Sequence, residues 1–261
     1  KIFHNIDREK YRLDFFFSGD KKNIYNDEIT QLGGRVFHGI YTRKNPIKAY
    51  YNYYKCVKDN DYKYILVVAP HSLSTIKLLV AKLAGAKVLA MRSSNTRITG
   101  GDFSKALNRM FSFLPQIVPN VKIAPSIAAG RFLFGNRCIE KNEVYILNNG
   151  TPLDEYKFDV EVRNQKRKEL NVKNEILFGH VGRFEPQKNH EYLIDVFAAI
   201  LHKLPSAKLV LIGDGVLKPK IIEKAKSLNI YDHIIFTGIR NDVPKLLMAM
   251  DALIFPSFYE G

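Results

Sequence analysis

Short runs of apolar, β-branched and aromatic residues alternate along the chain with longer stretches of helical periodicity. This alternation is typical of βαβ units and predicts parallel sheets covered by helices. The first group of predicted strands spans residues 12–18, 34–38, 64–70, 86–91, 121–125 and 144–148. The second group spans residues 175–182, 207–213, 233–238 and 252–257. The pattern therefore predicts an α/β protein built from two Rossmann-like halves.

The interval between the two groups of strands, from Asp154 to Asn174, is polar and basic. A chain of 261 residues is long for one α/β domain and comfortable for two of about 100 to 200 residues each. We therefore expect a first domain over residues 1–150, a linker region over residues 151–174 and a second domain over residues 175–261.

The predicted helices carry apolar residues at helical spacing, as helices that cover a sheet do. One example is the stripe formed by Leu193, Ile194, Phe197 and Leu201. Asn189 precedes this helix and is expected to cap its first turn.

Composition narrows the class of protein. The hydrophobic fraction of 46% indicates a globular chain, and lysine plus arginine exceed aspartate plus glutamate by 14. Such an excess indicates attraction to nucleic acid, an acidic membrane surface or a phosphorylated substrate.

Cys56 and Cys138 form no CxxC, so neither a disulfide framework nor a zinc site is predicted, and a reducing cytoplasm fits best. No apolar stretch reaches the roughly 18 residues that span a bilayer.

The turns after the strands of the second half are candidates for a ligand site, because open parallel sheets bind ligands outside the carboxyl ends of their strands. These turns are "GRFEPQKN", "GDGVLK", "GIRNDV" and "PSFYEG". The first contains Arg183 and Lys188, which alone would be ordinary solvated cations. Together with the neighbouring glycines and the positive end of a helix dipole, the two cations suit a diphosphate.

Two common nucleotide motifs are missing from the sequence. "GDG" at residues 213–215 is followed by Val216, Leu217 and Lys218 and does not complete GxGxxG, which disfavours an NAD dehydrogenase. There is also no GxxxxGK[ST], which disfavours a P-loop NTPase.

Three segments of the second half resemble the donor-binding domain of the family 4 glycosyltransferases: "FGHVGRFEPQKNHEYLIDVF", "LVLIGDG" and "IIFTGIRNDVPKLLMAMDALIFPSFYEG". In the first half, "HSLSTIKLLVAKLAGAKVLAMRSSNTR", "SIAAGRFLFG" and "VYILNNG" resemble members from exopolysaccharide and capsule synthesis, so the resemblance extends over essentially the whole chain. It implies the GT-B fold, with two Rossmann-like domains facing across a cleft. It also implies a retaining transfer of a hexose from a nucleotide sugar, with no bound metal and no other cofactor.

The same resemblance assigns roles to residues. Arg183 and Lys188 fall on the family's diphosphate-binding pair, which stabilises the departing nucleoside diphosphate. Glu260 falls on the first carboxylate of the E-x7-E motif, beside the donor sugar, whereas the second carboxylate would fall beyond Gly261. The other donor-binding candidates are turn residues, with "GDG" close to the nucleotide and the turn after residue 237 at the nucleobase: Gly182, Gly213, Gly215, Gly238 and Ile239.

Some features depart from the family's pattern. Where relatives often have "AHSHNT", this chain has "MRSSNT", which places Arg92 near the transferred sugar in place of a histidine. His71, at a turn that the resemblance places on the cleft, is a catalytic candidate, with an ordinary strand-end histidine as the alternative. His180 is predicted to be a core residue. The family's first strand and Gly-rich loop normally precede the stretch matching residues 5–7. We therefore expect a piece of a longer enzyme, with an incomplete second domain.

Two stretches combine aromatic and basic residues at helical spacing, residues 46–58 and 103–115. This composition is typical of helices that lie on an anionic membrane, although helices that cover a sheet can show it too. A surface of this kind would suit a lipid-linked acceptor at the inner face of the plasma membrane.

The leading hypothesis is a hexosyltransferase that uses a nucleotide sugar, with UDP the expected base, and a glycan or lipid-linked acceptor of surface polysaccharide synthesis. A sugar-nucleotide epimerase shares the two-domain architecture and is one alternative. A non-enzymatic basic protein that binds membrane or nucleic acid is another. No RNP, zinc-finger or helix-turn-helix pattern supports nucleic acid as a partner.

Overall fold

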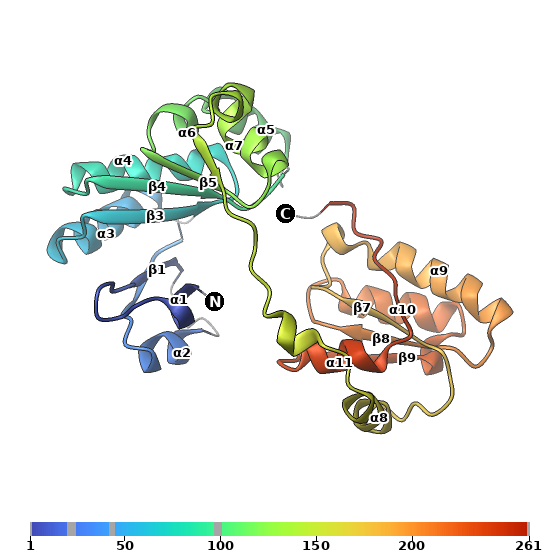
Figure 1. Ribbon diagram of the computed structural model, residues 1–261. Helices are drawn as coiled ribbons and strands as arrows, with labels where there is room; N and C mark the ends of the chain where they lie inside the picture. Colours follow the sequence, from blue (N-terminus) through green and yellow to red (C-terminus); the bar gives the residue numbers. More distant parts are fainter. Residues whose placement is uncertain (1, 20–24, 42–44, 97–100, 260–261) are drawn as a thin grey trace. The chain divides into compact units, whose positions relative to one another are not determined.

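A computed structural model describes residues 2–19, 25–41, 45–96 and 101–259. The chain divides into two compact units, residues 1–150 and residues 151–260 (Figure 1). Both units consist of parallel strands joined by helices, as the alternation of patterns predicts.

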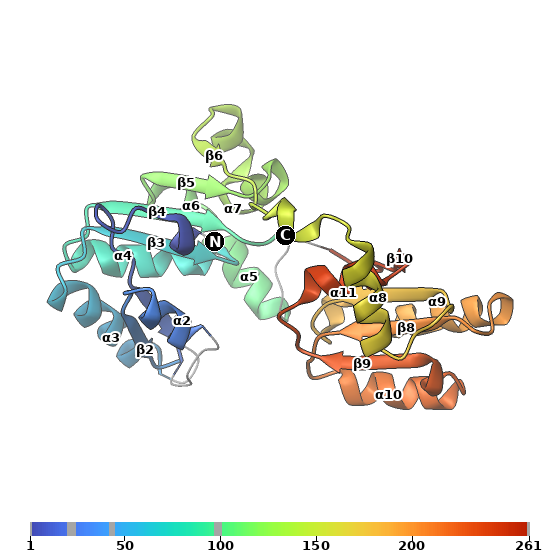
Figure 2. The same cartoon turned by 60° about the horizontal axis from the view of Figure 1, so that its bottom comes forward.

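The first unit contains two parallel sheets. Strands β1 (Phe15–Ser18) and β2 (Val36–Gly39) form one pair. The second sheet has the order β3-β4-β5-β6, which can be followed in Figure 2. Its strands are β3 (Tyr64–Ala69), β4 (Val88–Ser93), β5 (Val121–Ala124) and β6 (Val144–Ile146). The helices are α1 (Ile2–Asn5), α2 (Asn26–Gln31), α3 (Pro46–Asp59), α4 (Thr75–Leu83), α5 (Asp102–Met110), α6 (Leu114–Ile117) and α7 (Ile127–Glu140), with a 3-10 turn, η1 (Ser72–Ser74).

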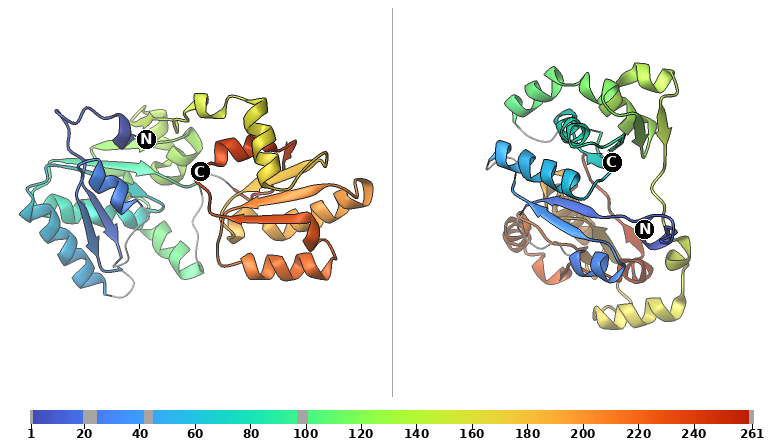
Figure 3. Two further views of the ribbon diagram at one scale, coloured as in Figure 1. Left: turned by 90° about the horizontal axis from the view of Figure 1, so that it is seen from below. Right: turned by 90° about the vertical axis from the view of Figure 1, so that its left-hand side faces the viewer.

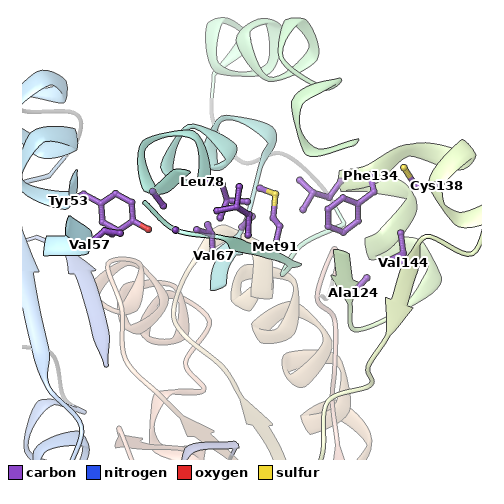
Figure 4. Close-up of a cluster of buried hydrophobic side chains, with 14 residues drawn as sticks. Tyr53, Val57, Val67, Leu78, Met91, Ala124, Phe134, Cys138 and Val144 are labelled. Atoms are coloured by element: carbon purple, nitrogen blue, oxygen red, sulfur yellow. The ribbon is translucent and has the colours of Figure 1, made fainter. Parts of the chain in front are cut away.

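Local sequence explains where these helices begin. Asn45 accepts a hydrogen bond from the amide of Lys48, and Pro46 occupies the first position of α3. Ser126 caps α7 in the same way, with Ala129 as the donor. The helices then place apolar side chains against the four-stranded sheet. Figure 4 shows this core, with side chains of α3, α4 and α7 lying against those of the strands.

Between β1 and β3 lies a groove of about 620 Å³, lined mainly by apolar side chains of β1, β3 and α3. On β3 the side chains of Tyr64, Leu66 and Val68 are more than half exposed. The expectation of a further strand ahead of residue 5 stays a prediction.

The second unit has one parallel sheet of order β10-β7-β8-β9. Its strands are β7 (Leu177–Val181), β8 (Lys208–Ile212), β9 (Ile234–Gly238) and β10 (Ala252–Leu253). The helices are α8 (Val160–Glu169), α9 (His190–Lys203), α10 (Lys218–Ser227) and α11 (Val243–Ala249), with 3-10 turns η2 (Leu153–Tyr156), η3 (Pro186–Lys188) and η4 (Tyr231–His233).

Strand β8 supplies a core on both faces of this sheet. Leu209 and Leu211 pack with residues of α9 and α10, whereas Val210 and Ile212 pack with residues of α11. The alternation follows from the two-residue period of a strand, and continuous apolar sequence is what a parallel strand buried on both faces requires. In the left-hand view of Figure 3, α8 and α11 lie on one side of the sheet and α10 on the other.

Residues 151–174, which the sequence suggests as a linker, lie within the second unit and include α8. Cations hold this polar helix to α11. Arg163 donates to the carbonyls of Met248 and Met250 at 3.0 Å, and Arg167 donates to that of Ala249 at 3.0 Å. These carbonyls lie at the C-terminal end of α11 and have no hydrogen-bond partner within the helix. Guanidinium groups therefore bind favourably at this end.

Strand β10 is shorter than the predicted run of residues 252–257. The chain pairs with β7 only as far as Leu253, although the amide of Ile254 still donates to the carbonyl of Gly179 at 2.9 Å. Pro256 has no N–H to extend the ladder. Among the described residues, no helix has the length and apolar content that crossing a membrane requires.

Candidate functional site

The turns after β7, β8 and β9 are bonded to one another through their backbones. The amide of Gly182 donates to the carbonyl of Ile212 at 2.9 Å, and that of Gly213 to the carbonyl of Gly238 at 2.8 Å. The amide of Phe184 donates to the carbonyl of Asp214 at 3.0 Å. Because the strands are parallel, these turns meet at the carboxyl edge of the sheet, which is the edge where such sheets bind ligands. The glycines named from sequence are therefore neighbours in space.

Glycine is required where these turns touch. Gly213 has φ +137°, and a Cβ there would collide with the carbonyl oxygen of Gly182. Gly215 has φ +156°, and a Cβ there would lie 2.7 Å from the carbonyl oxygen of Phe184. Both conformations lie in a region that side chains with a Cβ rarely adopt. Because glycine has no side chain, the backbones of the two turns can touch at this edge.

Arg183 projects from the first of these turns. Its side chain is 74% exposed, and its Nη1 lies 3.0 Å from Oε1 of Glu185. An exposed ion pair of this kind is worth little, so a phosphate can displace the carboxylate at small cost. The turn also leads into α9, a 14-residue helix whose positive end lies at the same edge.

Lys188 ends the 3-10 turn η3 and folds back beside Gly182. A Cβ on Gly182 would lie 3.1 Å from Cγ and Cδ of Lys188. The Nζ of Lys188 lies 5.4 Å from the centre of the Phe255 ring, within cation–π range. Lys188 therefore belongs to the same glycine-rich edge as Arg183.

Asn189 does not cap α9 as its position in the sequence suggests. Its φ of 54° places it in the left-handed region, and its side chain makes no capping hydrogen bond. Instead, Nδ2 of Asn189 donates to the carbonyl of Pro256 at 3.2 Å. The prediction was wrong because this left-handed turn directs the amide towards the segment after β10.

That segment, residues 254–259, is tied to the turn after β7. Gln187 donates from Nε2 to the carbonyl of Tyr259 at 2.8 Å, and its own carbonyl accepts from the amide of Phe258 at 3.0 Å. The segment thus reaches the edge that carries Lys188. Glu260 comes next but lies outside the described residues, so its role beside a donor sugar stays a prediction.

Three buried rings lie beneath the turn that carries Arg183. The ring of His190 stacks on Phe184 with centroids 4.1 Å apart and meets the ring of His180 edge-on at 4.8 Å. Nδ1 of His180 lies 2.9 Å from the carbonyl oxygen of Ile254. His180 is fully buried, which confirms its prediction as a core residue. Burial lowers the pKa of His190 to about 4, with further contributions from His180 and Lys188.

The turn after β9 exposes the side chain of Ile239 to 74%, next to Gly238 with φ +70°. A Cβ added on Gly238 would have no atom within 4 Å, so the space beside this residue is open. Arg240 follows and forms a two-pronged contact with Asp242, with Nε and Nη2 each 2.8 Å from a carboxylate oxygen.

The two candidates from the first unit lie at the carboxyl ends of neighbouring strands. His71 follows β3 and has its Nδ1 3.5 Å from Oγ of Ser74. Arg92 lies near the end of β4 and donates from Nη2 to Oδ1 of Asn149 at 2.6 Å. Asn149 was not named as a site residue on the basis of sequence. Its position after β6, at the carboxyl end of a parallel strand, is the signal that could have identified it. The three residues share one edge of the four-stranded sheet.

Among the residues that the structure describes, no three His, Cys, Asp or Glu side chains gather closely enough to hold a metal ion. The expectation of metal-independent chemistry remains a prediction.

Comparisons with known proteins identify the class. Residues 161–261 match the family model "Glycosyl transferases group 1". A relative named as the glycosyltransferase EpsF of Bacillus subtilis (strain 168) is 29% identical over 265 residues, which cover all of this chain and 69% of the relative. The UDP-Gal:alpha-D-GlcNAc-diphosphoundecaprenol alpha-1,3-galactosyltransferase of Escherichia coli is 29% identical over 127 residues, which cover 47% of this chain and 33% of that protein.

The solved structures agree on the fold. HepE of Anabaena in complex with UDP-glucose superposes with a TM-score of 0.71 at 19% identity, covering 94% of this chain and 73% of that chain. The chain therefore has the GT-B fold, and the match of residues 161–261 to the glycosyl transferases group 1 model, together with the glycosyltransferase names of the relatives, supports a glycosyltransferase. This result does not favour the epimerase or a non-enzymatic basic protein.

Replacement of Gly213 by alanine is expected to separate the turns after β7 and β8, because the new Cβ collides with Gly182 at a φ that alanine disfavours. Gly238→Ala is the matched control, since φ is positive there too but no atom lies within 4 Å of an added Cβ. We expect Gly213→Ala to lower the free energy of unfolding in urea by several kcal/mol and Gly238→Ala by about 1 kcal/mol. Equal losses would mean that the contact is unimportant.

Stability is expected to depend on pH through His190. In the unfolded chain this ring gains a proton near pH 6.5, whereas in the folded chain it does so only near pH 4. Between these values the unfolded state binds more protons, so stability falls as pH is lowered, by up to about 1.4 kcal/mol per pH unit. Urea denaturation of His190→Phe from pH 7.5 to 4 should show a shallower decline. His202→Phe, at an exposed position of the same helix, should follow the wild type; identical profiles for all three proteins would contradict the assignment.

Proposed function

We propose that the chain belongs to a retaining, metal-independent hexosyltransferase that takes its sugar from a nucleotide donor and passes it to a glycan or lipid-linked acceptor. The observation that carries the proposal is the glycine-rich edge of the second sheet, from which the exposed side chain of Arg183 projects in a weak ion pair with Glu185. Backbone in close approach, a helix N-terminus and two cations are what a nucleoside diphosphate requires.

The comparisons support the donor and the acceptor class. Neighbouring structures are complexes of HepE with UDP and with UDP-glucose. The Escherichia coli relative is named for a UDP-Gal donor and a diphosphoundecaprenol acceptor, and a Salmonella typhi relative for Vi polysaccharide biosynthesis. We therefore favour a UDP-sugar as the donor and surface polysaccharide synthesis, at the cytoplasmic side of the membrane, as the setting.

In this proposal the protein acts mainly through position and charge. Arg183, Lys188 and the first turn of α9 bind the diphosphate and stabilise it as negative charge grows on the leaving group. The family resemblance gives Glu260 a role at the donor sugar, and the leaving phosphate helps to deprotonate the acceptor hydroxyl on the same face. The family resemblance gives His71 a catalytic role and Arg92 a role near the transferred sugar.

Binding of UDP to Arg183→Ala tests the diphosphate site. Loss of one charge-assisted contact of about 1.5 to 3 kcal/mol should raise the dissociation constant roughly ten- to hundredfold in calorimetry. Lys203→Ala removes an exposed cation at the opposite end of α9 and should bind UDP as the wild type does. Unchanged affinity in Arg183→Ala would remove the basis of the proposal.

A peripheral contact with an anionic membrane is supported by α5 and α6. In this region, Phe103 is 79% exposed and Ile117 is 70% exposed, and Lys105 and Arg109 are exposed as well. Helix α3, the other aromatic and basic stretch, instead buries Tyr53 and other residues in the core. Exposed apolar side chains beside cations are typical of an interfacial surface.

Sedimentation with vesicles tests this surface. The wild type should bind to vesicles that contain phosphatidylglycerol and should bind far more weakly to vesicles of pure phosphatidylcholine. The reason is that each cation near anionic lipid contributes about 1 kcal/mol to binding. The double variant Phe103→Ser and Ile117→Ser should lose most of this binding. Tyr51→Ser, an exposed position of α3, should retain it, and equal binding by both variants would place the contact elsewhere.

A further inference from the structure

Four charged side chains form a closed square beside the turn after β9. Lys166 and Glu169 come from α8, and Arg240 and Asp242 come from the turn. The Nζ of Lys166 lies 2.7 Å from Oε2 of Glu169 and 2.6 Å from Oδ2 of Asp242. Nη2 of Arg240 lies 2.6 Å from Oε1 of Glu169 and 2.8 Å from Oδ2 of Asp242. Each cation therefore bridges both carboxylates.

The square is better protected from water than an ordinary surface ion pair. The side chain of Lys166 is 12% exposed, and those of Asp242 and Arg240 are 25% and 28% exposed. Hydrogen bonds from Arg240 and then Lys166 hold the pKa of Asp242 far below its usual range, so its carboxylate stays charged. A network with a planar guanidinium fork restrains geometry more strongly than an isolated pair does.

A second set of contacts also holds α8 in place. Arg163 and Arg167 already bind that helix to the carbonyls that end α11 and to Asp251. The square lies at the other end of α11, where the chain has just left β9. Its distinct contribution is to tie residues 240–242 to α8.

The tied segment adjoins the open backbone of the edge described above. Gly238, with φ +70°, offers its carbonyl to the amide of Gly213, and Ile239 is exposed. Only Ile239 separates this glycine from Arg240, so the square restrains the main chain of residues 238–239. A planar nucleobase that binds there would contact a backbone whose position is already fixed in the free protein.

We propose that Lys166, Glu169, Arg240 and Asp242 form a positioning clamp that fixes the turn at residues 238–239 for the nucleobase of the donor. This inference rests on the proposed function. The four residues act through the turn and touch neither the diphosphate nor the sugar. Pre-positioning lowers the cost of binding, so loss of the clamp weakens recognition of the base and leaves the diphosphate contacts intact.

Two probes separate base recognition from diphosphate binding: UDP, which carries both groups, and inorganic pyrophosphate, which lacks the base. Arg240→Gln and Glu169→Gln should each raise the dissociation constant of UDP about five- to tenfold, or roughly 1 to 1.4 kcal/mol, and leave that of pyrophosphate unchanged. Arg240→Lys keeps the charge and should recover part of the loss. Lys168→Gln, at an exposed position of α8 outside the square, should bind both probes as the wild type does.

The same variants separate a clamp from a purely structural role. Thermal unfolding should show a small change in Tm for Arg240→Gln, because α8 keeps its contacts with the end of α11. Unchanged UDP affinity, or equal weakening of UDP and pyrophosphate, would overturn the clamp. Arg183→Ala should weaken both probes, and if it weakened neither, the proposed function itself would fail independently of the clamp.

Discussion

The second unit depends on the contact between the backbones of two turns, at Gly182 and Gly213. A side chain at Gly213 would occupy the position of the Gly182 carbonyl, so the turns after β7 and β8 meet only because glycine has no Cβ. Amide hydrogen bonds join the turn after β7 to that after β8, and the turn after β8 to that after β9. The same contact brings Arg183 and Lys188 beside open backbone, where an anion can be bound by charge and by N–H groups together.

The excess of positive charge has several separate uses. Arg163, Arg167 and Lys166 are largely buried and hold α8 to α11 and to the turn after β9. Arg183 is mostly exposed, and among the described residues it forms an ion pair with Glu185. Net charge alone does not distinguish these roles. A cation that binds helix carbonyls and an exposed cation such as Arg183 contribute equally to the net charge.

Much of the fold and of the candidate site could be predicted from local patterns. Parallel strands are apolar throughout, and their carboxyl ends share an edge, which was enough to group Gly213, Gly238 and Arg183 before any coordinates. The sequence pattern did not assign helix α8 to the second unit. The reason is that cations, rather than an apolar stripe, hold this helix in place. Asn189 was predicted as a cap because sequence does not reveal a left-handed φ.

By itself, the sequence determined the alternation of strands and helices, the two halves and the glycine and arginine of the strand-end turns, since these follow from periodicity and residue type. Only the tertiary structure decided which partners those residues have: Arg92 with Asn149, Gln187 with Tyr259, and the square that joins α8 to the turn after β9. The physical reason is that these contacts join residues 57 to 76 positions apart, and such pairs are set by the packing of elements rather than by local preference.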